Sequence, residues 1–314
     1  MINVLLTNSG RRDYFVDYLN EIKFSKIRIF CTDTNKNVPT ISKKKIFKYF
    51  ITKEALKFPK VYKKQIKNIV NKYKIDLVIP LSDYDLKILA DLKDEKKNGK
   101  NKSFFLVSDK KIIDICISKK KSFIFLNENN FFSPNIYKSV KEIKKFPVVI
   151  KEDYGNGSKN LKIITNKNEL PNKISSKMII QEHIQGKEYN IDILNNFRRK
   201  FVSCSSKLKL IMRAGETDRC KIVANKKLFD FSIQLSKCLK HIGNLDVDVI
   251  IRRRKIFIID VNPRFGGGYP FTHVSGLNYI SYIISLLNNK KPKIKNYNDY
   301  ELFMNKGISV YAQK

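Results

Sequence analysis

The chain of 314 residues has no tryptophan and few glycines, prolines and histidines (12, 9 and 3, respectively). No apolar run approaches the roughly 18 to 20 residues that a membrane span needs. The short apolar run over residues 2–7 also lacks the basic lead-in of a signal peptide. We therefore expect no membrane partner.

Cysteine is also scarce. The five cysteines are scattered, odd in number and without a C-x-x-C pair: Cys31, Cys116, Cys204, Cys220 and Cys238. This pattern argues against a disulfide framework and against a structural zinc site. It favours reduced thiols in a cytoplasmic protein.

Acidic residues are few, with 29 Asp and Glu against 63 Lys and Arg, which gives a formal net charge of +34. Such a charge raises nucleic acid as a partner. Only 11 of the basic residues are arginine, however, and the lysines are spread through every region. Arginine is the side chain suited to bidentate phosphate and base recognition. The charge therefore indicates codon bias more than a nucleic-acid surface, which stays the alternative.

The length predicts about two domains, and 42% hydrophobic residues are enough for a core. Strand and helix patterns alternate over the first hundred residues, which is typical of a parallel sheet with helices on its faces. Strands are expected at 3–7, 27–31, 76–80 and 104–107, and helices at 14–22, 62–70 and 86–92. No G-x-G-x-x-G is present. Ser9-Gly10-Arg11 is either an anion-binding nest or a plain turn.

The pattern changes after Asp109. Helices are expected at 119–130, 140–145 and 227–241, and strands at 146–151, 161–165, 178–184, 189–194, 201–206, 246–251 and 255–261. The last two strands are joined by a basic turn, which predicts a hairpin.

This hairpin carries the densest set of polar residues. Asp260 and Asn262 lie two apart on one strand, so their side chains share a face. Asp248 is expected opposite them on the partner strand. Carboxylate and amide oxygens suit Mg²⁺ better than zinc, and Arg264 would lie on the phosphate side of the metal. The alternative is a polar outer face of a surface hairpin.

Two lysines and a small-residue loop form a second feature. Lys119 opens a helix, and Lys151 ends a strand just before the loop Gly155-Asn156-Gly157-Ser158. A lysine charge and close backbone amides suit phosphate oxygens. The loop is not a Walker P-loop, and each lysine by itself is by default a solvated surface residue.

The segment from Ile179 to Asp192 is a third feature, in which a short turn joins two strands. Glu188 is suited to ribose hydroxyls, and the backbone around Glu182 to Ile184 to an adenine edge. His183 is either a base or a side chain that packs or lies exposed at the turn.

The order of these motifs resembles the ATP-grasp superfamily, in particular one synthetase half of the carbamoyl phosphate synthase large subunit. The resemblance covers nearly the whole chain. It is carried by V-L-L-T-N-S-G-R-R at the start, I-C-x-x-K at 115–119, F-P-V-V-I-K at 146–151, I-I-Q-E-H-I-x-G-x-E-Y at 179–189, R-A-G-E at 213–216 and D-V-N-P-R-F-G-G-G-Y-P at 260–270.

The resemblance implies an α/β and α+β fold: a Rossmann-like, pre-ATP-grasp parallel sheet domain over 1–108, then a two-subdomain ATP-grasp fold over 109–314. The small lid would span about 109–180 and the larger, metal-binding subdomain about 181–314. ATP would be bound by Lys119, Lys151, Gly155, Gly157, Ser158, Gln181, Glu182, His183, Ile184 and Glu188. Mg²⁺, or Mn²⁺ in its place, would be bound by Asp248, Asp260 and Asn262. Arg264, Lys151 and Arg213 would be catalytic.

The implied activity is ADP-forming ligation of a small-molecule, amino-acid or sugar carboxylate to an amine or ammonia, through an acyl phosphate. The resemblance is compatible with a homodimer and with a separate amidotransferase that supplies ammonia. The chain departs from the family at Asp260, where Glu is usual, and at Ser118, where C-N-D-K reads Cys116-Ile117-Ser118-Lys119. These departures motivate an alternative, a non-catalytic ATP-binding regulator. A further alternative is a kinase-like protein that stops at a phosphorylated product.

Overall fold

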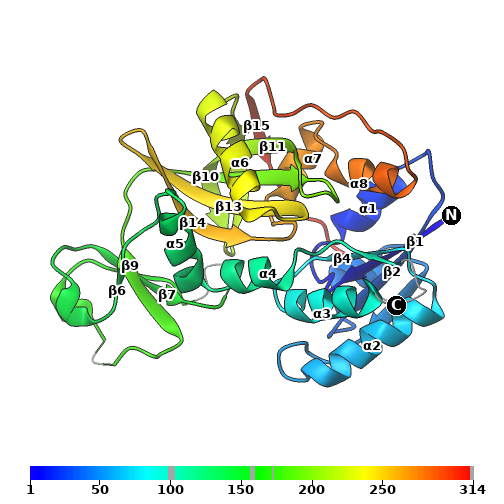
Figure 1. The fold of residues 1–314 in the computed structure, drawn as a ribbon, viewed down its shortest axis with the longest axis horizontal. Coiled ribbons are helices and arrows are strands. Elements are labelled where there is room, and N and C mark those ends of the chain that lie inside the picture. The colour runs from blue at the N-terminus through cyan, green and yellow to red at the C-terminus, as the bar shows by residue number, and fades with distance from the viewer. Residues whose placement is uncertain (98–102, 156–159, 172, 312–314) are drawn as a thin grey trace.

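The computed structural model describes residues 1–97, 103–155, 160–171 and 173–311. The strands form three sheets (Figure 1). One sheet lies on the right of that view with β1, β2 and β4, one on the left with β6, β7 and β9, and the largest above and between them with β10, β13 and β14.

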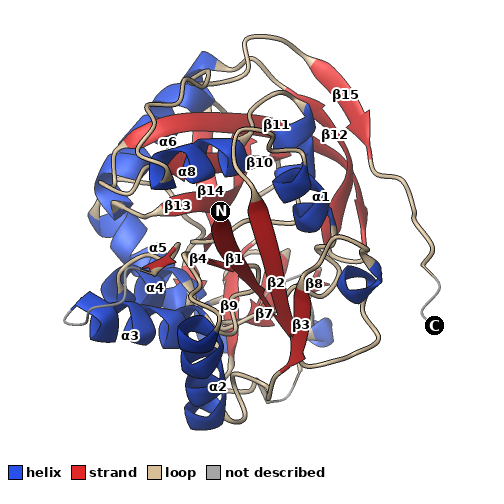
Figure 2. Ribbon diagram, turned by 90° about the vertical axis from the view of Figure 1, so that its right-hand side faces the viewer, coloured by secondary structure: helices blue, strands red, loops and turns tan. Residues whose placement is uncertain are grey.

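The N-terminal sheet is parallel, with strand order β3-β2-β1-β4-β5. Side chains alternate across it: Leu5 packs with α2 and α3 on one face, whereas Val4 and Leu6 pack with α1 and α8 on the other. Figure 2 shows this sheet with α2 and α1 near its two sides. The elements are β1 (Ile2–Thr7), α1 (Tyr14–Asn20), β2 (Ile27–Asp33), the 3-10 turn η1 (Pro39–Ser42), β3 (Lys48–Ile51), α2 (Pro59–Lys72), β4 (Leu77–Pro80), α3 (Leu86–Lys97) and β5 (Phe104–Phe105).

The second sheet is small and antiparallel, with order β6-β9-β7-β8. Its own core is limited to Val148, Ile150, Ile164 and Ile180 with partly buried neighbours. The segment contains α4 (Lys110–Cys116), α5 (Lys119–Glu128), β6 (Ile136–Tyr137), η2 (Val140–Glu142), β7 (Val148–Glu152), β8 (Lys162–Ile164), η3 (Lys167–Glu169) and β9 (Met178–Glu182).

The largest sheet is antiparallel, with order β14-β13-β10-β11-β12-β15. Ile191, Val247 and Ile258 on one face pack against α6 and α5, and the opposite face is polar. The elements are β10 (Lys187–Asn195), β11 (Phe201–Arg213), β12 (Glu216–Ile222), α6 (Lys226–Leu239), β13 (Gly243–Arg252), β14 (Lys255–Asn262), α7 (Tyr269–Val274), α8 (Tyr279–Leu287) and β15 (Leu302–Asn305).

The predicted fold class is confirmed, but several expectations about single elements are corrected. The expected helix at 140–145 is a single 3-10 turn, and the strand at 104–107 ends at Phe105. The strands β3, β6, β12 and β15 and the helices α4, α7 and α8 were not expected. The first sheet also shares a core with the C-terminal helices, because the ring of Phe15 lies 5.0 Å from that of Phe265 and 5.6 Å from that of Tyr269. The domain boundaries at 108 and near 180 fall between the sheets and stay predictions.

Across the described ranges of the chain, no helix combines the length and the apolar character needed to span a bilayer. The five cysteines are free thiols, four of them buried.

Candidate active site

A cavity of about 720 Å³ lies where the three sheets meet. Its walls come from the loops after β1 and β4, from the lid strand β7 and from the polar face of the largest sheet. Eight residues predicted from the sequence line it together: Lys119, Lys151, Gly155, Glu188, Asp248, Asp260, Asn262 and Arg264. The prediction that these distant segments converge is therefore supported by the geometry.

The acidic hairpin forms one wall, and a β-bulge sets its geometry. Asp248 pairs with Asp260, and Asp246 with Asn262, as expected for residues on one face. The next pair is Val249 with Ile258, so Ile259 is an extra residue on β14. Without it, Asp260 would lie on the same face as Ile258, which is fully buried against α6 and α5. The bulge thus directs both polar side chains into the cavity.

The two predicted phosphate lysines reach this hairpin from the lid. Lys151 on β7 donates to the carbonyl of the bulge residue Ile259 at 3.0 Å. Lys119 at the start of α5 donates to the carbonyl of Gly155 at 2.8 Å and lies 3.3 Å from a carboxylate oxygen of Asp260. Burial would raise the pKa of Asp260, but the ammonium groups of Lys119 and Lys151 outweigh burial and hold it below its ordinary value.

The Ser118 departure is compensated in the structure. Ser118 caps α5 by accepting from the backbone N–H of Lys121, and its hydroxyl donates to Asp153 at 3.0 Å. Asp153 also accepts from the backbone N–H of Lys120 at 2.8 Å. A carboxylate therefore lies beside the helix N-terminus even though the sequence has serine at the position where the family has aspartate.

Arg264 connects the polar face of the largest sheet with the loop after β4 in the N-terminal sheet. Its guanidinium donates to Asp246 at 2.8 Å and to Asp83, in the loop after β4, at 2.9 Å. The Arg264 side chain is 5% exposed, and its Nε is buried without a hydrogen-bond partner. This donor remains available to a ligand oxygen in the cavity.

The sequence analysis missed two lysines on β11. Lys209 lies between Glu188 and Asp248, with its Nζ 2.6 and 2.9 Å from their oxygens. Lys207 is fully buried against Asp192 at 2.6 Å. Lys207 and Lys209 alternate with Leu208, so both share the face that carries the acidic residues. The alternation of lysine and leucine over residues 207–209 is the sequence pattern from which these two lysines could have been predicted to share the polar face.

Other predicted residues lie outside the cavity wall. Arg213 at the end of β11 is half exposed and paired with Asp218 at 2.5 Å. Residues 181–184 form the end of β9 and the turn into β10, where His183 is half-buried and Glu182 pairs with Arg252 at 3.2 Å. Gln181 is buried with its side-chain carbonyl unpartnered, which fits a polar ligand edge. Gly157 and Ser158 lie outside the described residues.

The donor set fits a hard divalent cation and an anion together. Asp260 and Asn262 line the cavity, with the Asn262 amide donating to Asp260 at 3.2 Å, and the side-chain carbonyl of Asn190 is buried there without a partner. The predicted set has two carboxylates and one amide. Among the residues that can be described, no three His, Cys, Asp or Glu side chains group as a metal site. Gly268 packs so closely that a Cβ would lie 2.5 Å from that Asn190 oxygen.

The loop after β1 forms the opposite wall. The Gly10 N–H donates to Asp33 at 2.7 Å, so the interpretation as a plain turn is favoured over an anion-binding nest. Arg12 extends from this loop toward Glu216, 3.9 Å away, and Glu216 also pairs with Lys306 at 3.2 Å. Burial would raise the pKa of Glu216, but these cations outweigh burial and lower it.

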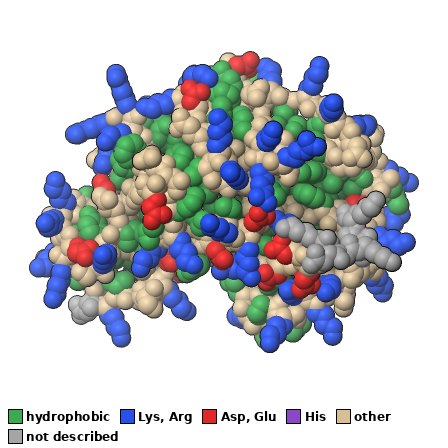
Figure 3. Space-filling model, in the orientation of Figure 1, with side chains coloured by type: hydrophobic (Ala, Val, Ile, Leu, Met, Phe, Trp, Pro, Cys, Tyr) green, Lys and Arg blue, Asp and Glu red, His purple; other side chains and the backbone are tan. Residues whose placement is uncertain are grey.

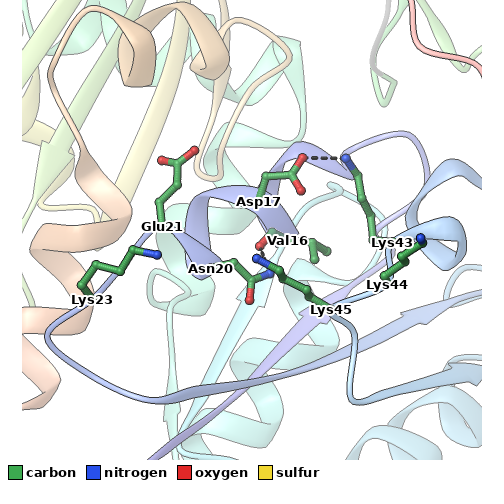
Figure 4. Close-up of a pocket in the computed structure, with 8 residues that line it drawn as sticks. All are labelled: Val16, Asp17, Asn20, Glu21, Lys23, Lys43, Lys44 and Lys45. Atoms are coloured by element: carbon green, nitrogen blue, oxygen red, sulfur yellow. Dashed lines mark hydrogen bonds and ion pairs between the residues drawn. The ribbon is translucent and has the colours of Figure 1, made fainter.

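A smaller hollow of about 360 Å³ lies between α1 and residues 43–45, and Figure 4 shows Lys43 paired with Asp17 there at 2.6 Å. None of the predicted site residues lines it. Lysine and arginine side chains are distributed over the whole visible face of the molecule in Figure 3 rather than collected in one patch. This distribution agrees with a charge that arises from overall composition.

Comparison with known proteins agrees with the fold. Residues 116–268 match a family described as the ATP-grasp domain, and residues 4–101 match one described as the PylC-like N-terminal domain. The fold and the lysine- and carboxylate-lined cavity thus define an ATP-grasp protein. The chain therefore carries an ATP-grasp domain, preceded by a PylC-like N-terminal domain.

The relatives are distant. A D-alanine–D-alanine ligase of Fusobacterium nucleatum is 30% identical over 123 residues, which are 36% of this chain and 43% of that protein. The chain matches less than half the length of such curated relatives. Among solved structures, N5-carboxyaminoimidazole synthetase of Staphylococcus aureus complexed with ADP has a TM-score of 0.72 at 12% identity, covering 97% of this chain and 80% of that one. An L-amino acid ligase of Bacillus licheniformis has a TM-score of 0.65 at 15% identity, covering 91% and 74%.

Proposed function

We propose that the protein is an ADP-forming ATP-grasp ligase that joins a small-molecule, amino-acid or sugar carboxylate to an amine or ammonia. The observation that carries the proposal is the convergence of Lys119 and Lys151 from the lid, Asp260 and Asn262 from the hairpin, and Arg264 on one cavity. The D-alanine–D-alanine ligase and L-amino acid ligase named above perform chemistry of this class.

The reaction would have two steps. A carboxylate oxygen of the acceptor forms a bond to the γ-phosphorus of ATP while the bond to the ADP oxygen breaks. The amine nitrogen then forms a bond to the acyl carbon while the bond from that carbon to the phosphate oxygen breaks; inorganic phosphate leaves and the nitrogen releases one proton to solvent or to the departing phosphate. Phosphoryl transfer of this kind depends on positioning and charge neutralisation more than on covalent participation of the protein.

Residues of this chain would supply those two functions. Lys119 and Lys151 would bind the phosphates, and the Arg264 guanidinium would stabilise charge on the transferring group. Asp260 and Asn262, with Asp248 beside them, would hold Mg²⁺ or Mn²⁺, which when bound would neutralise phosphate charge. The Gly155 turn and the lid sheet would exclude water, which otherwise hydrolyses an acyl phosphate.

The hinge would bind the base and ribose of ATP. Gln181, Glu182, His183 and Ile184 connect the lid to the largest sheet, and Glu188 follows at the start of β10. Glu188 lines the cavity, whereas the hinge residues lie outside its wall, so we propose that closure of the lid on ATP brings them in. Arg213 keeps a proposed acceptor-side role, although here it is paired with Asp218.

Calorimetric binding of a non-hydrolysable ATP analogue, with and without Mg²⁺, tests the site. Micromolar binding that requires Mg²⁺ and weakens in Asp260→Ala is expected. Asp299→Ala is the matched control, because Asp299 forms a surface ion pair with Lys295 far from the cavity wall. Binding indifferent to both metal and Asp260 would overturn the assigned site.

ADP release over a panel of carboxylates and amines then separates the alternatives. A regulator would bind the analogue without releasing ADP for any acceptor, and a kinase-like protein would give a stable phospho-product without an amine. A nucleic-acid-binding protein would bind any polyanion with a steep salt dependence and no need for Mg²⁺. The Ser118 departure motivates the regulator as an alternative. Because Asp153 places a carboxylate beside the same helix N-terminus, we favour the ligase.

The partners and location follow the same proposal. Ammonia supply by a separate amidotransferase, a homodimer and a cytoplasmic location each stay predictions. The free thiols support the last of these. Size-exclusion chromatography with light scattering tests the homodimer.

A further inference from the structure

Lys209 is the most buried cation of the cavity wall that the proposed mechanism does not use. Its side chain is 6% exposed and lies between two carboxylates, 2.6 Å from Glu188 and 2.9 Å from Asp248. Two carboxylates at ion-pair distance hold this ammonium in place in the cavity wall.

The Asp248 carboxylate is fully engaged by protein donors. One oxygen accepts from Lys209, and the other accepts from the side-chain amide of Asn190 at 2.9 Å. Asp260 is held by longer contacts, to Lys119 at 3.3 Å and to the side-chain amide of Asn262 at 3.2 Å. Of the two carboxylates predicted to bind metal, Asp260 is therefore the more loosely held.

The elements that carry the two lysines explain this difference. Lys119 starts α5 in the lid segment, so movement of the lid on a nucleotide can separate it from Asp260. Lys209 lies on β11, and Asp248 on β13, on either side of β10 in one continuous sheet. No motion of the lid separates that pair. The sheet therefore fixes the backbone positions of Lys209 and Asp248 relative to each other.

We infer that Lys209 is a built-in cation that takes the place of a second divalent ion at Asp248 and Glu188, so that the site holds a single metal ion at Asp260 and Asn262. This inference rests on the proposed function, because it presumes nucleotide binding in this cavity. An ammonium and a divalent cation both neutralise phosphate charge, but the ammonium needs no free metal.

The test counts Mn²⁺ ions per bound nucleotide by electron paramagnetic resonance, with a non-hydrolysable ATP analogue at saturation. One ion is expected in the wild-type protein. Lys209→Met removes the charge at similar length and frees Asp248, so the count is expected to rise to two. Lys209→Arg keeps the cation and should stay at one. Lys221→Met, which breaks a surface pair with Glu301 on the same sheet, is the matched control and should also stay at one.

The outcomes separate the two proposals. Two ions in the wild-type protein would overturn the inference alone, and this count needs no variant to fold. A count of one in folded Lys209→Met would also overturn it. Failure of the wild-type protein to bind the analogue at all would overturn the proposed function and the inference with it.

Discussion

Replacing Arg264 by methionine tests whether this residue connects the two halves of the active site. The substitution leaves the carboxylates of Asp83 and Asp246 without the guanidinium that lies 2.9 and 2.8 Å from them. Their side chains are only 16% and 11% exposed, so water recovers little of the lost interaction. Breaking a buried pair by removing one partner typically costs about 3 to 5 kcal/mol. We expect the free energy of unfolding to fall by about that amount.

Urea unfolding followed by far-ultraviolet circular dichroism measures this change, because the chain has no tryptophan for fluorescence. The matched control is Arg252→Met, whose pair with Glu182 is partly exposed, with side chains 36% and 25% accessible. Solvent screening limits that loss to less than about 1 kcal/mol. A triple variant that also carries Asp83→Asn and Asp246→Asn should recover part of the stability, because both buried carboxylate charges are then removed.

An equal loss in Arg264→Met and Arg252→Met would refute the reasoning. It would mean that the two carboxylates near Arg264 find water or other partners, and that the N-terminal domain is held to the sheet by apolar packing alone.

The burial of Lys151 and His241 and the close packing of Gly186 lead to three further predictions. Burial lowers the pKa of Lys151 to about 8, so its charge is lost as pH rises through that value. The affinity for an ATP analogue should therefore weaken above pH 8 in the wild-type protein and stay level in Lys151→Arg, as calorimetry across pH would show. Burial also lowers the pKa of His241 to about 4 from an ordinary 6.5, so the neutral ring is favoured in the folded state. Stability is then lost as pH falls from 6.5 toward 4, on the order of 3 kcal/mol, and His241→Gln should flatten that part of the urea-midpoint profile. A Cβ on Gly186 would lie 2.4 Å from the carbonyl oxygen of Ile251, whereas one on Gly307 would meet open space. Gly186→Ala should cost about 1 to 3 kcal/mol and Gly307→Ala almost nothing, as thermal unfolding of the two variants would show.

The fold was largely predictable because hydrophobic periodicity is a local property. Strands such as 3–7 and helices such as 62–70 carry patterns that the structure confirms, within a few residues, as β1 and α2. The missed strands β3, β6, β12 and β15 have weaker signals. β3 and β15 are edge strands without a buried residue, so no alternation of buried and exposed positions marks them.

The residues that line the candidate site could be predicted from the sequence, but their contact partners could not. Lys119, Lys151, Asp260, Asn262 and Arg264 follow from type and order along the chain, and they do converge. Their contacts come from segments far away in sequence. Lys151 reaches a carbonyl 108 residues away, and Arg264 reaches a carboxylate 181 residues away. Nothing local in the sequence indicates such pairs.

The sequence by itself determined which elements form and which chemical groups they offer, since both depend on residue type and spacing. Tertiary structure decided the direction of those groups. The extra residue Ile259 turns Asp260 and Asn262 to the cavity, and three strands side by side place Lys209 between Glu188 and Asp248. A one-residue change in register reverses the face of every later side chain, and register is set by pairing across the sheet rather than by the order of residues along one strand.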